Sequence, residues 1–172
     1  QNQESIAADV ILQADVNSLL RTIVINKGVR DGVAVGMPVV TRQGLVGRIT
    51  EVTADSSRVL LISDPSSAVS GRLQKSRAEG SVIGRAGGLT MTYIPLGAVV
   101  EQGDLVLTSG LGGNLPPDIV IGVVTSVQKF EFELYQQVQI QSLTDFNTLE
   151  IVLVITNFQP ADLSVFEDAG GQ

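Results

Sequence analysis

The chain has 172 residues, enough for one domain or two small ones, and 44% of them are apolar, so sizeable cores are possible. Its net charge is −7, with only 11 Lys and Arg and no basic cluster, which argues against nucleic-acid binding and against electrostatic docking on an anionic membrane. The absence of Cys excludes disulfides, thiolate nucleophiles and cysteine-based metal sites, and no run of 18 uncharged apolar residues predicts a membrane-spanning helix.

The apolar runs are short and rich in Val and Ile, and turn residues separate them, so the chain is predicted to be all-β with about twelve strands. The polar segment Gln1–Ile6 is expected to be the end of an upstream helix, and Asn17–Leu20 a turn or short helical link. The strands are expected at Ala8–Leu12, Thr22–Asn26, Pro38–Thr41, Leu45–Thr53, Arg58–Ile62, Val69–Leu73, Ser81–Ile83, Leu89–Ile94, Leu105–Thr108, Val120–Val127, Leu134–Ser142 and Leu149–Ile155.

The last part of the chain carries two further expectations. Ile151–Ile155 is apolar at every position, so this strand is expected to be covered on both faces. The tail 159–172 is rich in Pro, Gly and acidic residues and is predicted to be flexible or loosely attached.

An internal repeat organises the chain. The first copy consists of Gly36–Thr41, Gly44-Leu45 and Gly47–Val52, and the second of Gly103–Thr108, Gly110-Leu111 and Gly122–Val127. A recurring unit of this size in two copies indicates two related small β-domains rather than a solenoid. The second copy contains an insert, Gly112–Ile119. Gly47 and Gly122 are therefore expected to occupy equivalent bends or tightly packed positions.

The sequence offers little for catalysis. It has no His, which removes the usual proton shuttle and excludes a Ser-His-Asp triad. The three lysines are Lys27, Lys75 and Lys129, and they are expected to be solvated, whereas a catalytic Lys must be buried. Ser76 next to Lys75 cannot form a productive pair by adjacency alone.

Other chemical patterns are weak. Glu131 and Glu133 share one face of an extended segment and are expected to lie on the outside of a hairpin. The glycine-rich run Gly110–Leu115 lacks the Lys-Ser/Thr of a phosphate loop, and Pro116-Pro117 follows it, so a barrel corner is favoured. The scattered Asp residues resemble turn formers and not metal ligands. We predict no catalytic residue, no cofactor and no metal, and hence a binding or structural module.

Four ordered segments resemble signatures of one known family. They are Asn26–Val33 (NKGVRDGV), Gly36–Val40 with Gly44–Ile49, Ser57–Pro65 (SRVLLISDP) and Thr108–Ile119 (TSGLGGNLPPDI), the last being the most specific. On these residues the chain, from about Ala8 to Ile155, resembles the extracytoplasmic region of the rod-shape-determining MreC family.

The resemblance implies two six-stranded β-barrels in tandem, a chymotrypsin-like double-barrel architecture, preceded by a membrane helix and a coiled coil. Of these preceding segments, residues 1–6 would be a remnant. Taken with the repeat, it leads us to expect a first barrel at 29–95 and a second, discontinuous barrel formed by 7–28 plus 96–158.

The resemblance also implies a function without catalysis. The protein would be a periplasmic scaffold of the cell-elongation machinery that controls cell shape. It would bind and position or activate the elongation-type penicillin-binding transpeptidase, link it to MreD and indirectly to MreB, and self-assemble as a dimer or filament. Its only attachment to the membrane would be the N-terminal helix. The alternative is a degenerate protease-like double barrel acting as a hydrolase or small-ligand binder.

Two partner-binding candidates follow. The first is a set of four aromatics, because aromatic residues are enriched at binding hot spots, although ordinary core or hairpin packing would also explain them. The second is a rigid exposed corner, which could equally be a structural turn. The aromatics are Tyr93, Phe130, Phe132 and Tyr135; the corner comprises Gly110, Leu111, Gly112, Gly113, Leu115 and Pro116.

Overall fold

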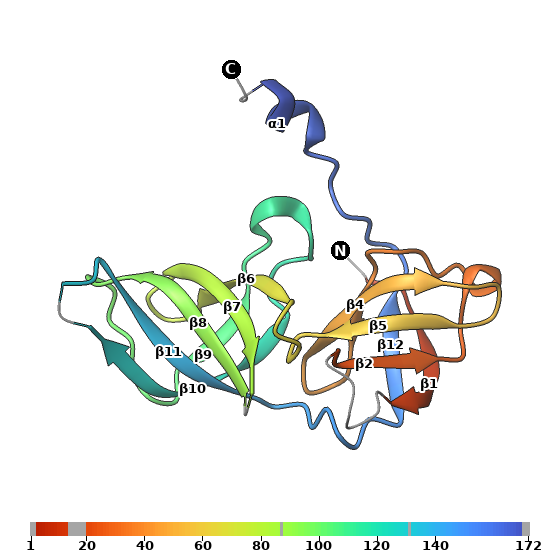
Figure 1. Ribbon diagram of the computed structural model, residues 1–172, viewed down its shortest axis with the longest axis horizontal. Helices are drawn as coiled ribbons and strands as arrows, with labels where there is room; N and C mark the ends of the chain where they lie inside the picture. The colour runs from red at the N-terminus through yellow and green to blue at the C-terminus, as the bar shows by residue number, and fades with distance from the viewer. Residues whose placement is uncertain (1–2, 14–19, 87, 131, 170–172) are drawn as a thin grey trace.

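The computed structural model describes residues 3–13, 20–86, 88–130 and 132–169, and these residues form two closed six-stranded barrels side by side (Figure 1). The expected link Asn17–Leu20 falls almost wholly outside the described residues. Barrel A contains β1 (Ser5–Gln13), β2 (Thr22–Ile25), β3 (Pro38–Val40), β4 (Leu45–Val52), β5 (Ser57–Leu61) and β12 (Ile151–Ile155). Barrel B contains β6 (Ala68–Leu73), β7 (Glu79–Arg85), β8 (Gly88–Pro95), β9 (Leu105–Thr108), β10 (Val120–Lys129) and β11 (Tyr135–Ser142).

The all-β class, the double barrel and all twelve predicted strands are confirmed. The predicted division into barrels is wrong. The discontinuous barrel is the one that holds the first repeat copy, since β2 pairs with β5 and β1 pairs with β12. Residues 7–28 therefore complete the first barrel and not the second, and barrel B is one continuous stretch inserted between β5 and β12.

The N-terminal segment also differs from expectation. Ser5 and Ile6 lie in β1, where they pair with Ile155 and Val154, and the Thr156 amide donates to the Glu4 carbonyl oxygen at 2.9 Å. The interpretation of residues 1–6 as the end of a helix is therefore wrong for this part of the segment. The apolar positions of β1 have a partner strand at the far end of the chain, which local sequence cannot indicate.

The two barrels share one topology. Around barrel B the neighbours run β6-β7-β8-β11-β10-β9, and around barrel A they run β12-β1-β2-β5-β4-β3. Barrel A is therefore a copy of barrel B whose first strand comes from the C-terminal end of the chain. The repeat corresponds to β3–β4 in one barrel and β9–β10 in the other.

Glycines mark the equivalent positions. Gly36 and Gly103 precede the paired strands with φ of 92° and 94°, a left-handed conformation that favours glycine. An added Cβ would lie 2.0 Å from the Leu60 carbonyl oxygen at Gly47 and 2.2 Å from the Gln141 carbonyl oxygen at Gly122. The prediction that Gly47 and Gly122 are equivalent close-packed sites is confirmed.

The barrel cores are aliphatic and meet at a continuous junction. Leu45 and Val40 of barrel A pack with the core of barrel B, and Phe146, in the connection between β11 and β12, contacts both cores. An added Cβ at Gly44 would lie 2.4 Å from the Val120 carbonyl oxygen, so the β3–β4 turn sits directly on β10. These contacts hold the barrels against each other.

A buried carboxylate organises the β5–β6 connection. Asp64 is 1% exposed and accepts hydrogen bonds from the Arg21 amide at 2.5 Å and from the Ser66 amide at 2.8 Å and hydroxyl at 2.5 Å. Burial by itself would raise the pKa of Asp64, but these hydrogen bonds outweigh it and hold the pKa below its usual value. The ionised carboxylate thus ties the residue before β2 in barrel A to the connection that leads into barrel B.

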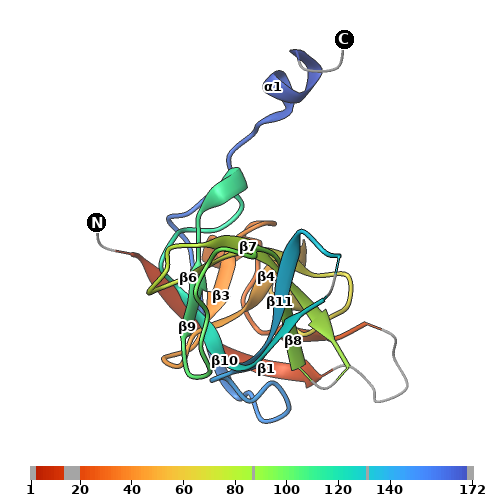
Figure 2. The same ribbon diagram turned by 90° about the vertical axis from the view of Figure 1, so that its left-hand side faces the viewer.

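The end of the chain departs from two expectations. Ile151 is 61% exposed, so the prediction that β12 is covered on both faces is wrong at this position. The tail is anchored where it starts, because Pro160 lies against Gly36 and the Ala161 amide donates to the Gly113 carbonyl oxygen at 3.0 Å. Beyond these contacts α1 (Ser164–Ala169) projects away from both barrels (Figure 2).

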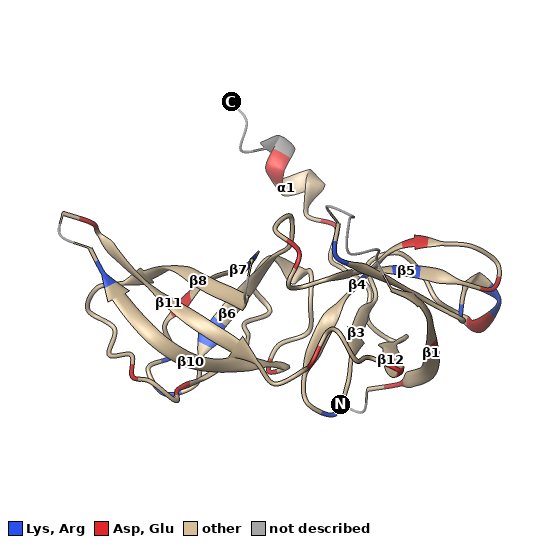
Figure 3. Ribbon diagram, turned by 60° about the horizontal axis from the view of Figure 1, so that its bottom comes forward, with Lys and Arg blue, Asp and Glu red and all other residues tan. Residues whose placement is uncertain are grey.

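Charged residues are interspersed over both barrels (Figure 3). Among the described residues no helix is long and apolar enough to cross a membrane. No group of three or more potential metal ligands occurs in that part of the chain either.

Candidate partner-binding surfaces

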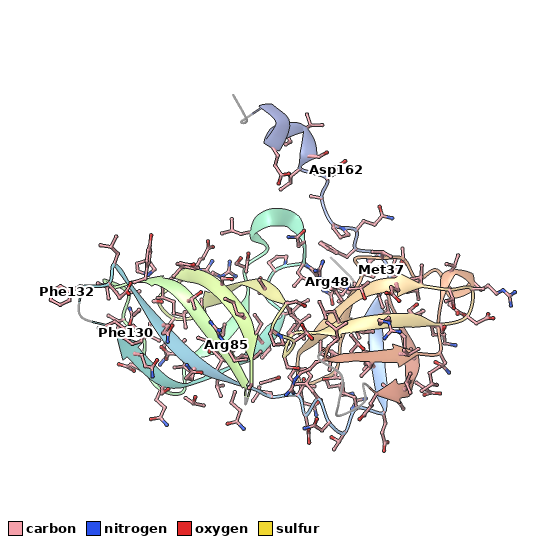
Figure 4. The ribbon with its side chains drawn as sticks, viewed as in Figure 1. Met37, Arg48, Arg85, Phe130, Phe132 and Asp162 are labelled. Carbon is pink, nitrogen blue, oxygen red and sulfur yellow. The ribbon has the colours of Figure 1, made fainter. Side chains whose placement is uncertain are left out.

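The four candidate aromatics gather at the end of barrel B that faces away from barrel A. Phe130 and Phe132 lie on the connection between β10 and β11, at the extremity of the molecule (Figure 4). Tyr135 opens β11 and pairs with Pro95 at the end of β8, close to Tyr93. We call the set Tyr93, Phe130, Phe132, Leu134 and Tyr135 the aromatic end.

Tyr93 is turned outward by a β-bulge. Met91 pairs with Val138 and Ile94 pairs with Gln136, so two residues of β8 stand opposite one of β11. Tyr93 adopts φ of 64°, a left-handed conformation that costs a non-glycine residue roughly 1–2 kcal/mol. Bulges of this kind re-aim side chains. Tyr93 is 64% exposed, and its ring meets that of Tyr135 edge-on, with centroids 5.7 Å apart.

The hairpin tip presents its apolar side chains to solvent. Phe132 has φ of 71° and is 98% exposed, while Leu134 is 78% exposed and Phe130 is 50% exposed. The Glu133 amide closes the turn on the Phe130 carbonyl oxygen at 3.2 Å. Phe132 contributes almost nothing to folding by burial, so core packing does not explain this residue.

A buried glutamine braces the surface from beneath. Gln136 is 1% exposed, and its amide nitrogen donates to the carbonyl oxygens of Pro95 and Ala98, both at 2.8 Å. These bonds hold the turn after β8, which carries the exposed side chains of Leu96 and Val99. Sequence reasoning missed Leu96, Val99 and Leu134, because each is an ordinary aliphatic residue and only the fold shows that its side chain is exposed.

The second candidate, residues 110–116, is a loop that rises between the barrels (Figure 1). It contains the short 3-10 helix η2 (Leu111–Gly113), and Gly110, Gly112 and Gly113 all have left-handed φ. Thr108 fixes its base, since the Thr108 hydroxyl donates to the Pro116 carbonyl oxygen at 2.7 Å and accepts from the Ile119 amide at 2.9 Å. Leu111 is 56% exposed.

The structure does not bring the two candidates together. The aromatic end occupies the outer tip of barrel B, whereas the η2 loop stands over the junction of the barrels (Figure 4). A partner could contact one without the other. Only the aromatic end combines exposed aromatic rings, a strained backbone and a buried polar brace.

A hydrolytic site has little support in the groove between the barrels. A groove of about 620 Å³ is lined by Arg21, Ser63, Thr144 and Asp145 among others. The Ser63 hydroxyl is buried without a hydrogen-bond partner among the described residues, so no nucleophile–base pair is formed there in this structure.

Comparisons with known proteins agree on one family. The family model "Rod shape-determining protein MreC, barrel core" matches residues 11–156. The cell shape-determining protein MreC of Haemophilus influenzae is 32% identical over 147 residues, which cover 84% of this chain and 42% of that protein. The chain therefore spans less than half the length of this relative.

Solved structures share the fold. A structure of MreC from Listeria monocytogenes is 32% identical and superposes with a TM-score of 0.85, over 94% of this chain and 80% of that one. A solved complex between penicillin-binding protein PBP2 and MreC from Helicobacter pylori also matches, with a TM-score of 0.70 over 91% of this chain and 100% of the other. Identity to that chain is 15%, so it shows the fold alone.

Proposed function

Because the chain belongs to the rod shape-determining MreC family, whose relatives are cell shape-determining proteins, we propose that it is a non-catalytic scaffold that binds a peptidoglycan-synthesising penicillin-binding transpeptidase. The contact surface is the aromatic end of barrel B. The observation that carries this assignment is Phe132, a phenylalanine that is 98% exposed in a left-handed conformation. Neither property helps the chain to fold, and both suit a binding surface.

The partner class follows from the Helicobacter pylori complex, in which an MreC protein of the same fold binds PBP2. The chemistry of the surface fits such a partner. Gln136 fixes the turn after β8 beside this surface, so little conformational entropy is lost in ordering that turn on binding. Exposed apolar clusters on a folded monomer commonly mark protein–protein contacts.

In the full-length protein this region would lie on the periplasmic face of the inner membrane. By family resemblance, MreD, and indirectly MreB, would be further partners, and the protein would self-assemble into dimers or filaments. The strands of each sheet close into a barrel. Closure favours recognition through side chains over the addition of a β-strand.

Calorimetry with the extracytoplasmic region of the transpeptidase from the same organism tests the proposal. Phe132→Ala and Tyr135→Ala should each weaken binding about tenfold to a hundredfold, in line with hot-spot truncations of roughly 1.4–3 kcal/mol. Phe166→Ala is the matched control, since Phe166 is 72% exposed but lies on α1, and it should leave the affinity unchanged. Saturable binding whose affinity is unchanged in both Phe132→Ala and Tyr135→Ala would refute the assignment of the surface.

A further inference from the structure

A small cleft between the barrels holds a positive charge without a partner. Its lining includes Arg48 of β4, Ser70 of β6, and Leu111, Asn114 and Leu115 of the η2 loop. Its volume is about 100 Å³, which suits the end of a side chain, whereas small-molecule sites measure roughly 300–1,000 Å³. Among the described residues, no acidic side chain pairs with Arg48.

The C-terminal segment carries the complementary groups. Residues 159–172 include Asp162, Glu167 and Asp168 and no Lys or Arg. The amides of Phe166 and Glu167 both donate to the Leu163 carbonyl oxygen, at 3.0 and 3.2 Å, so these three residues share one face of the helical turn. That face bears two exposed apolar side chains and one carboxylate.

The same segment is already seated on the rim of the cleft. The Ala161 amide is bonded to the Gly113 carbonyl oxygen, and the next two residues of the loop, Asn114 and Leu115, line the cleft. In Figure 4, Arg48 lies below the η2 loop and Asp162 lies above it, where the tail rises toward α1. Only Asp162 and Leu163 separate this fixed point from α1, so the cleft is within reach of the helix.

We propose that the cleft is a docking site for the C-terminal segment of the same chain. In the docked state Glu167 pairs with Arg48, and Leu163 and Phe166 cover Leu111 and Leu115. Of Asp162 and Glu167, the carboxylate free to pair is that of Glu167, because Asp162 already accepts hydrogen bonds from the Ser164 amide at 3.0 Å and hydroxyl at 2.7 Å. A tether only a few residues long gives the segment an effective concentration of roughly millimolar at the site, which favours docking within one chain.

Disulfide trapping in the complete chain tests this proposal, because the chain has no cysteine of its own. The test pair is Leu111→Cys with Leu163→Cys, which keeps Phe166, Glu167 and Arg48. The control pair is Val99→Cys with Leu163→Cys, since Val99 is 71% exposed and lies in the connection between β8 and β9 of barrel B. In a glutathione redox buffer the test pair should form an intrachain disulfide at least tenfold faster than the control pair.

Charge variants show whether the trapping rate depends on the ion pair between Arg48 and Glu167 or only on the closeness of the two segments. Arg48→Glu should slow trapping of the test pair by roughly threefold to fivefold, the size of an exposed ion pair, and adding Glu167→Arg should restore the rate. Trapping no faster than in the control pair would overturn the proposal. A trapping rate of the test pair that Arg48→Glu does not change would also overturn it. Disulfides that form only between chains would do the same.

Discussion

Alanine at Gly47 should destabilise barrel A in a way that can be estimated from the structure. The added Cβ would lie 2.0 Å from the Leu60 carbonyl oxygen, 2.8 Å from the carbonyl carbon and 3.1 Å from the Leu61 Cα, where ordinary contact begins at 3.4 Å. All three atoms belong to the backbone of β5, so no side-chain rotation relieves the clash. The strands must separate by more than 1 Å at this point.

The magnitude follows from two contributions. Overpacking in a dense core costs about 1–3 kcal/mol, and each stretched strand hydrogen bond adds about 1 kcal/mol. We expect Gly47→Ala to lower the free energy of unfolding by about 3 kcal/mol, a large part of the roughly 5–15 kcal/mol that holds a typical domain. Gly122→Ala, with its Cβ 2.2 Å from the Gln141 carbonyl oxygen, should cost a similar amount in barrel B.

Urea unfolding followed by far-ultraviolet circular dichroism measures the loss, and amide hydrogen exchange locates it. Exchange should accelerate in β4 and β5 for Gly47→Ala and in β10 and β11 for Gly122→Ala. Gly97→Ala is the control, because nothing lies within 4 Å of its added Cβ, and it should change stability by no more than about 0.5 kcal/mol. Wild-type stability in either of the first two variants would refute the reasoning.

Three further outcomes are expected. The pKa of Asp64 in the folded protein lies below its usual value of 3.8, so its stabilising contribution is present above that pH and is lost as the pH falls through the folded-state pKa. An acid titration of unfolding should show this loss in the wild type and not in Asp64→Asn. Gln136→Leu should lower stability by about 1–3 kcal/mol, because the Pro95 and Ala98 carbonyl oxygens lose their donor, and a normal urea midpoint would argue against the brace. Phe132→Ala should leave the thermal midpoint unchanged, since its side chain is exposed, and a drop of several degrees would show a structural role.

The strands could be predicted because their signals are local. β-branched runs between Gly, Pro and Asp turns indicate strands wherever they occur, and the repeat located β3–β4 and β9–β10 within their barrels. The grouping of the other strands could not be obtained in this way. Ala8 pairs with Val152, more than 140 positions away, and no local pattern specifies that contact.

The candidate surface could also be predicted only in part, because it depends on contacts between strands that are distant in the sequence. The aromatic side chains were visible as residue types, but the bulge that turns Tyr93 outward depends on the register between β8 and β11. Leu96 and Val99 are exposed on a turn whose position depends on hydrogen bonds from Gln136 of β11 to the Pro95 and Ala98 carbonyl oxygens. Exposure of an aliphatic residue depends on tertiary packing and has no signature in a single sequence.

Hydrogen exchange of the chain in complex with its transpeptidase tests the central claim most directly. The account predicts that protection on binding will concentrate at residues 93–99 and 132–136, with the η2 loop and barrel A unchanged. Protection confined to barrel A or to residues 110–116, with exchange at residues 132–136 unaltered, would contradict it.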